Sequence, residues 1–102
     1  MEKTNRGFSV DRFLDLYGSK CSIQKSSLAT DDAIWIGIDD AEPKILASKA
    51  ASFVVDTTET TGWVPYPIPD EVLLTTRMHL NREQVAELLP TLQRFVETGE
   101  LE

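Results

Sequence analysis

The residues best suited to chemistry stand at alternate positions late in the chain. Thr75, Arg77 and His79 recur at every second residue, so their side chains would share one face of a β-strand. A hydroxyl, a guanidinium and an imidazole on one face suit a phosphate, because Arg presents a fork of N–H donors to its oxygens. On the residues alone, a solvated sheet face with Arg77 paired to a surface carboxylate is the simpler interpretation.

An amide and two hydroxyls in the first third of the chain would extend such a site. Gln24 and Ser26 lie at alternate positions of the segment 21–26, which begins with the apolar–polar alternation of a half-buried strand, and Ser27 follows it. If this strand neighbours the one that carries Arg77, polar residues from both strands would line one sheet face.

Three aromatic side chains could stack on the base of a nucleotide. Trp35 belongs to a segment rich in isoleucine, whereas Trp63 and Tyr66 belong to residues 63–69, where three alternate prolines favour an extended path. The candidate ligand-binding residues are therefore Gln24, Ser26, Ser27, Trp35, Trp63, Tyr66, Thr75, Arg77 and His79.

No motif in the chain indicates catalysis. Glycine-rich phosphate loops and the HExxH and GxSxG motifs are missing, and His79 is the only histidine. Cys21 is also alone, so it can form neither an internal disulfide nor a cysteine-based metal cluster. The pairs Asp31–Asp32 and Asp39–Asp40 could bind a divalent ion, although adjacent carboxylates usually cap turns. We therefore predict no enzyme, no metal site and no cofactor.

Length and charge narrow the class of protein. At 102 residues the chain fits a single domain, 1–102, whose polar residues 1–8 are expected to form a disordered tail. The formal net charge is −7, and since DNA and RNA polymers need a basic footprint, we expect neither as a partner. Basic residues gather in the first 25 positions, which leaves room for a local anion pocket. Without a long apolar run or a leader-like start, no membrane partner is expected.

Strands of one antiparallel sheet are expected to position the candidate side chains. The segments that alternate or are rich in β-branched residues are 13–16, 21–26, 33–38 and 74–80. Gly18 supplies the positive φ that a tight hairpin turn between the segments 13–16 and 21–26 needs. Cys21 and Ile23 would face the core, as would Met78 on the last strand. Residues 8–16 also fit a short helix.

An amphipathic helix should follow the last strand. Asn81 is a good N-cap, and Gln84 three residues later completes a capping box. Apolar residues then recur at helical spacing as far as Gly99, a typical C-terminal stop, and Pro90 within the helix predicts a kink. We therefore predict an α+β fold, a small antiparallel sheet with the C-terminal amphipathic helix packed on one face.

The middle of the chain is less regular. Pro43 suits the first turn of a short helix over residues 44–51, and residues 53–55 could form a brief strand. The kinked helix and the proline-rich segment 63–69 present more apolar surface than one modest core can hide, so we expect a homo-oligomer.

Several runs of the sequence resemble a family of short proteins encoded in tailed-phage genomes. The runs that carry the resemblance are Cys21–Thr30, Ala33–Gly37, Gly62–Pro69, Thr76–Leu80 and Leu88–Leu101. Together they cover most of the chain from Phe13 onward. Small phage proteins of this general kind include oligomeric sponges that sequester the nucleotide signals of bacterial immunity, such as the cyclic dinucleotides of CBASS or the ADP-ribose derivatives of Thoeris.

The resemblance therefore implies an immune-evasion protein that acts in the host cytoplasm. It would bind a nucleotide second messenger, of the cyclic oligonucleotide or cyclic ADP-ribose type, without cleaving it. The alternative is a protein-interaction module that inhibits a host enzyme or defence protein through its acidic surface.

Overall fold

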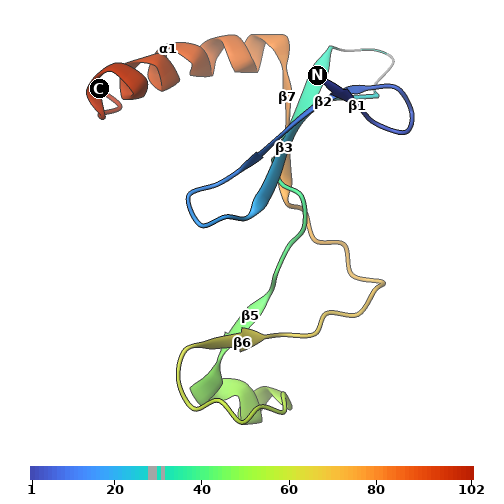
Figure 1. Cartoon of the computed structure of the whole chain (residues 1–102), viewed down its shortest axis with the longest axis vertical. Helices are drawn as coiled ribbons and strands as arrows, with labels where there is room; N and C mark the ends of the chain where they lie inside the picture. Colours follow the sequence, from blue (N-terminus) through green and yellow to red (C-terminus); the bar gives the residue numbers. More distant parts are fainter. Residues whose placement is uncertain (28–29, 31) are drawn as a thin grey trace. The chain divides into compact units, whose positions relative to one another are not determined.

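The described part of the chain forms two compact units. The computed structural model describes residues 1–27, 30 and 32–102. The larger unit contains Met1–Asp39 and Thr76–Glu102, and the smaller one contains Asp40–Thr75 (Figure 1). Whether both fold as the single domain that the length indicates stays a prediction.

The larger unit is built on one antiparallel sheet of five strands in the order β1-β2-β3-β4-β7. These strands span Glu2–Lys3, Ser9–Leu14, Lys20–Lys25, Ala33–Ile38 and Arg77–Asn81, respectively. The predicted hairpin turn is confirmed at Gly18, which has a φ of 83°. Asp15 Oδ1 stabilises this turn by accepting hydrogen bonds of 2.9 Å from the backbone N–H groups of Tyr17 and Ser19. The segment that also fitted a helix is β2, because the hairpin pairs it with β3.

The N-terminal segment departs from the disordered tail expected for residues 1–8. β1 pairs with β2, and Gly7, at a φ of 85°, closes a turn in which its N–H donates to Thr4 O at 2.9 Å. Thr4 Oγ1 accepts a second bond from Phe8 N–H at 3.1 Å. These local bonds and the pairing with β2 order a segment whose polar composition by itself indicates disorder.

Strand register gives the sheet two chemically different faces. The polar face carries two rows of paired residues, Arg12–Ser22–Gly37–Arg77 and Val10–Gln24–Trp35–His79. The apolar face carries Phe13, Cys21, Ile23, Ile34, Ile36, Ile38, Met78 and Leu80, together with the charged Asp11 and Lys25. The alternation predicted for the last strand is therefore confirmed from Arg77 onward.

The residues that are buried on these two faces are only partly those that the sequence predicts to be buried. Ser22 and Ser26 are only 1% and 2% exposed, whereas Ile23 and Met78, which were expected in the core, are exposed. The serines are enclosed by polar partners on their own face, described below. On the apolar face Cys21 is buried and Ile34, Ile36 and Leu80 are half-buried, whereas Phe13, Ile23, Ile38 and Met78 remain open to solvent.

Helix α1 (Arg82–Thr98) begins and ends where the sequence predicts. The capping box is present, since Asn81 Oδ1 accepts from Gln84 N–H at 2.8 Å and Gln84 Oε1 accepts from Asn81 N–H at 2.9 Å. Gly99, at a φ of 77°, ends the helix by donating to Phe95 O at 2.8 Å. The predicted fold class is confirmed: the protein is α+β, with an antiparallel sheet and a C-terminal helix packed against it. None of the helix's residues, all of which are described, is buried.

The smaller unit consists of a two-stranded sheet and a 3-10 helix. β5 (Lys44–Leu46) pairs with β6 (Trp63–Pro65), and η1 (Ala47–Phe53) follows β5. The helix expected over residues 44–51 is wrong in its first turn, because these residues pair with β6. The strand expected over residues 53–55 is also wrong, because Val54 adopts a left-handed φ of 59° and ends η1. The small core consists of Ala47, Ala50 and Val64, with Ile45 and Val55 packed against it.

Candidate functional site

The centre of the polar face is a stack of two rings from adjacent strands. Trp35 on β4 lies opposite His79 on β7, with the ring centroids 3.9 Å apart and the planes inclined by 9°. His79 Nε2 lies 2.8 Å from Ser26 Oγ, within hydrogen-bonding distance, and the tautomer decides which atom donates. The imidazole is thus held by a ring on one side and a buried hydroxyl at its edge.

Arg77 lies beside this stack and owes its position to a glycine. Its Cζ is 5.9 Å from the Trp35 ring centroid, in the range of a cation–π contact. Gly37 faces Arg77 across the strand pair, and a Cβ there would lie 2.5 Å from Thr76 O and 2.9 Å from Arg77 Cα. Only glycine permits this close approach. Within the described residues Arg77 forms no salt bridge, unlike Arg12, Lys25 and Arg82.

A hydrogen-bonded network occupies the neighbouring part of the polar face. Ser22 Oγ donates to Asp39 Oδ1 at 2.7 Å, and Arg12 reaches Glu2 at 3.0 Å and Asp39 at 3.7 Å. This network accounts for the burial of the Ser22 hydroxyl and neutralises Arg12. Sequence reasoning missed it, because its members come from three strands and the residue after β4, and no local pattern joins them.

The ordered N-terminal segment forms one wall of a cleft on the same unit. The cleft has a volume of about 290 Å³ and is lined by Thr4, Asn5, Arg6, Phe8, Gln24, Ser27 and Trp35. Arg6 stands over the Phe8 ring, with its Cζ 5.8 Å from the centroid. The residues before position 9 were missed as site residues because a disordered tail was expected. The turn-forming Gly7 next to an aromatic residue is the signal that could have found them.

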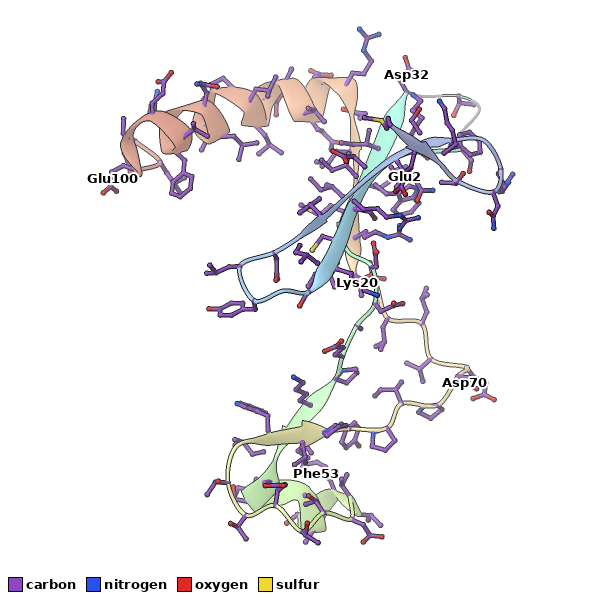
Figure 2. The ribbon with its side chains drawn as sticks, in the orientation of Figure 1. Glu2, Lys20, Asp32, Phe53, Asp70 and Glu100 are labelled. Carbon is purple, nitrogen blue, oxygen red and sulfur yellow. The ribbon has the colours of Figure 1, made fainter. Side chains whose placement is uncertain are left out.

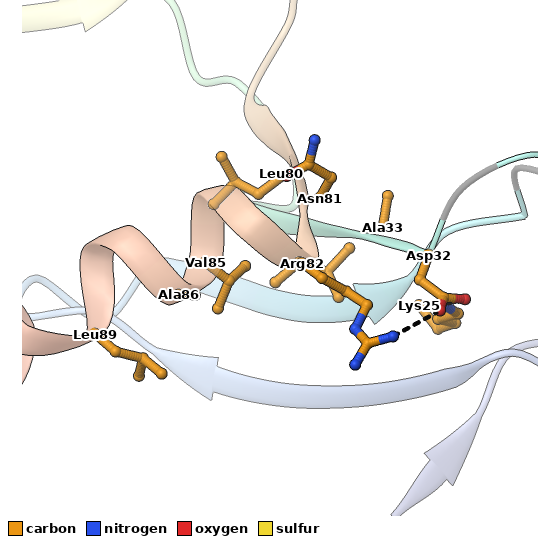
Figure 3. A pocket seen from close by; sticks show the side chains of 10 residues that line it. Lys25, Asp32, Ala33, Leu80, Asn81, Arg82, Val85, Ala86 and Leu89 are labelled. Atoms are coloured by element: carbon orange, nitrogen blue, oxygen red, sulfur yellow. Dashed lines mark hydrogen bonds and ion pairs between the residues drawn. The ribbon is translucent and has the colours of Figure 1, made fainter.

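A second hollow separates the start of α1 from the sheet. This helix groove has a volume of about 470 Å³ and is lined mainly by apolar residues of the helix and of β4 and β7 (Figure 3). At its rim, Asp32 accepts a hydrogen bond from Lys25 at 3.0 Å and lies 3.7 Å from Arg82. The hydrogen bond and charge of Lys25, aided by Arg82, lower the pKa of the Asp32 carboxyl.

The predicted site residues fall into two groups. The cleft and the ring stack bring together Gln24, Ser26, Ser27, Trp35, Arg77 and His79. Trp63, Tyr66 and Thr75 belong to the smaller unit, where Trp63 and Thr75 are exposed and Tyr66 N–H donates to Pro43 O at 2.9 Å. Thr75 precedes β7, so the alternation that placed it beside Arg77 does not extend to it.

The acidic pairs and the lone cysteine have local explanations where the structure describes them. Asp32 pairs with Lys25, and Asp39 accepts from Ser22, whereas Asp31 lies outside the described residues. Burial, and then the carboxylates of Asp15 and Asp39, raise the pKa of the Cys21 thiol. Residues 1–27, 30 and 32–102 contain no group of three or more His, Cys, Asp or Glu side chains placed to hold a metal ion.

Comparison with known proteins provides no function for this chain, so a functional proposal must rest on the geometry of the site. No family model, curated protein or solved structure matches the chain. Among the described residues, no helix combines the length and the apolar run that crossing a bilayer requires.

Proposed function

We propose that this protein binds a nucleotide second messenger on its polar face and sequesters it without cleaving it. The messenger would be of the cyclic oligonucleotide or cyclic ADP-ribose type, and the protein would serve a phage in immune evasion in the host cytoplasm. The observation that carries the proposal is the Trp35 indole, held against His79 and forming a wall of a cleft that also contains Arg6 and Gln24.

Each part of a nucleotide has a fitting group on this face. Base stacking on an aromatic ring is worth about 1–3 kcal/mol, and Trp35 is one of the residues that line the cleft. The amides of Asn5 and Gln24 can donate and accept at a base edge. Arg6 at the cleft and Arg77 beside the indole supply the charge for phosphate.

The size of the cleft bears on the ligand. A volume of about 290 Å³ is at the lower end of small-molecule sites, which usually measure about 300–1,000 Å³. It suits one nucleoside unit better than a whole cyclic dinucleotide. A second nucleoside unit of the ligand would extend along the polar face. There Arg77, which lies beside Trp35, could bind the phosphate of that unit.

Binding without cleavage is favoured by the environment of the one serine–histidine pair. Ser26 Oγ and His79 Nε2 have the 2.8 Å separation of a nucleophile and its base. Ser26, however, is only 2% exposed, so a substrate atom has no access to its hydroxyl. This burial supports a pair that orients the imidazole against Trp35 over one that attacks a ligand.

The test is a thermal-shift panel of cyclic dinucleotides, cyclic trinucleotides and cyclic ADP-ribose isomers. A ligand at 100 times its dissociation constant stabilises a native protein by about 2.7 kcal/mol, which is easily measured in a domain of this size. Mass spectrometry of the ligand released on heating should find it intact. A converted ligand would contradict sequestration, and no shift at saturating concentrations would favour the protein-interaction alternative.

Variants of Arg77 locate the site. Arg77→Ala should cost about 1.5–3 kcal/mol of binding free energy, and Arg77→Lys should recover part of it, since an ammonium cannot reproduce the bidentate fork. Arg94→Ala is the matched control, because Arg94 is an exposed arginine on α1 whose Nη1 donates to Leu101 O. A ligand whose affinity survives Arg77→Ala unchanged would bind elsewhere.

A further inference from the structure

Helix α1 carries an apolar stripe that the rest of the larger unit leaves uncovered. Its first turns face the sheet across the helix groove, which Val85, Ala86 and Leu89 line. Beyond them the helix runs away from the sheet toward Glu100 (Figure 2), and Leu88, Leu92 and Phe95 are each about half exposed. A helix that serves only as the cover of its own sheet would bury this stripe.

The apolar face of the sheet is open in the same way. Phe13, Ile23, Ile38 and Met78 are exposed on adjacent strands, and register places them on one continuous surface. Within the described residues of the larger unit, the buried hydrophobic side chains are Val10, Cys21 and Ala33, none of them large. Such a core is too small to hold five strands and a helix together, so the uncovered surfaces need a partner.

We propose that the partner is a second copy of this chain, with α1 of each copy lying across the apolar face of the other. The two uncovered surfaces belong to one sequence, so a single two-fold operation covers both and leaves no open end. Their lengths also agree, because a helix of 17 residues is about 25 Å long and a strand of six residues about 20 Å.

The exposed apolar area and the charges around the helix groove favour a second copy of the chain over an unrelated protein as the partner. The exposed residues named on the stripe and the apolar face amount to roughly 600–700 Å² per copy, at the lower end of the roughly 600–1,000 Å² that a standard interface covers on each partner. Among the described residues, the rim of the helix groove holds two cations, Lys25 and Arg82, against the one carboxylate of Asp32. The last turn of α1 and its extension carry Glu97, Glu100 and Glu102. A partner helix running toward the groove therefore brings carboxylates to a rim with spare positive charge.

The first experiment compares two phenylalanines with the same exposure. Phe95 lies on the stripe and Phe53 lies in the smaller unit, and both are 55% exposed. In light scattering coupled to chromatography, the native chain and Phe53→Asp should both have twice the 11.4 kDa of one chain. Phe95→Asp should have the mass of one chain or dissociate at a concentration at least tenfold higher than the others. A monomeric native chain, or equal behaviour of both variants, would overturn the proposal.

The second experiment tests directly whether α1 of each copy lies on the apolar face of the other copy. It does not depend on a substitution that weakens the dimer. Two proteins, each with Cys21→Ala, carry either Met78→Cys on the apolar face or Leu92→Cys on the stripe. After mixing and mild oxidation, disulfides should link one protein to the other and should form poorly within each sample alone. Links confined to identical chains would show a face-to-face or helix-to-helix dimer and would refute the exchanged arrangement. The nucleotide thermal shift is read on a different face, so its failure would leave these outcomes unchanged.

Discussion

Replacing Gly37 by alanine would disturb the polar face at its most crowded backbone contact. Gly37 has a φ of 150°, which side chains other than glycine rarely adopt, and an added Cβ would lie 2.5 Å from Thr76 O. Strain of this kind costs about 1–3 kcal/mol. Forcing β4 and β7 apart adds about 1–3 kcal/mol more, as overpacking does. We therefore expect the free energy of unfolding to fall by about 2–6 kcal/mol, the sum of the two contributions.

Gly18→Ala is the matched control for this substitution. Gly18 also has a positive φ, 83°, but an added Cβ there meets no atom within 4 Å. Its loss should be limited to about 1–2 kcal/mol of backbone strain. Urea unfolding followed by far-UV circular dichroism, at one protein concentration for all variants, measures both values. Equal losses for Gly37→Ala and Gly18→Ala would show that the close approach of Arg77 to β4 is not tight, and would refute the reasoning.

Three further perturbations test the cap, the thiol and the ion pair. Asn81→Ala removes the acceptor of the capping box, so it should lower the free energy of unfolding by about 1 kcal/mol and reduce helical circular dichroism; an unchanged value would mean that the cap is dispensable. The pKa of the Cys21 thiol is raised in the folded protein. The contribution of the neutral thiol to the free energy of unfolding is therefore complete below the ordinary thiol pKa, and it is lost as the pH rises through the higher folded pKa. Alkylation at pH 8 should therefore be slow in the native protein and fast in denaturant, and equal rates would contradict the burial. The pKa of Asp32 is lowered, so its contribution is present at neutral pH and disappears as the pH falls through its folded pKa. Lys25→Met should accordingly be less stable than the native chain at pH 7 but equally stable in acid, and a difference that persists in acid would point to packing of the lysine stem.

Local patterns in the sequence were sufficient for the hairpin, the last strand and the helix. The turn at Gly18, the alternation from Arg77 to Leu80 and the cap at Asn81 depend on neighbours a few residues apart, and the structure has all three. The same alternation correctly placed Arg77 and His79 on one face. It failed at Thr75, because the strand begins only where β4 offers a pairing partner. The kink at Pro90, which lies inside α1, stays a prediction.

Contacts between distant residues decided the rest of the candidate site. His79 meets Ser26 from 53 positions away, and Ser22 meets Asp39 from 17 positions away, so no window of sequence contains either pair. The wall of the cleft before residue 9 depends on pairing of β1 with β2, which composition alone does not reveal. The sequence determined which side chains share a face, since strand and helix periods are local. How much of the apolar face stays exposed was decided by the direction in which α1 leaves the sheet, because burial depends on contacts between distant parts of the chain.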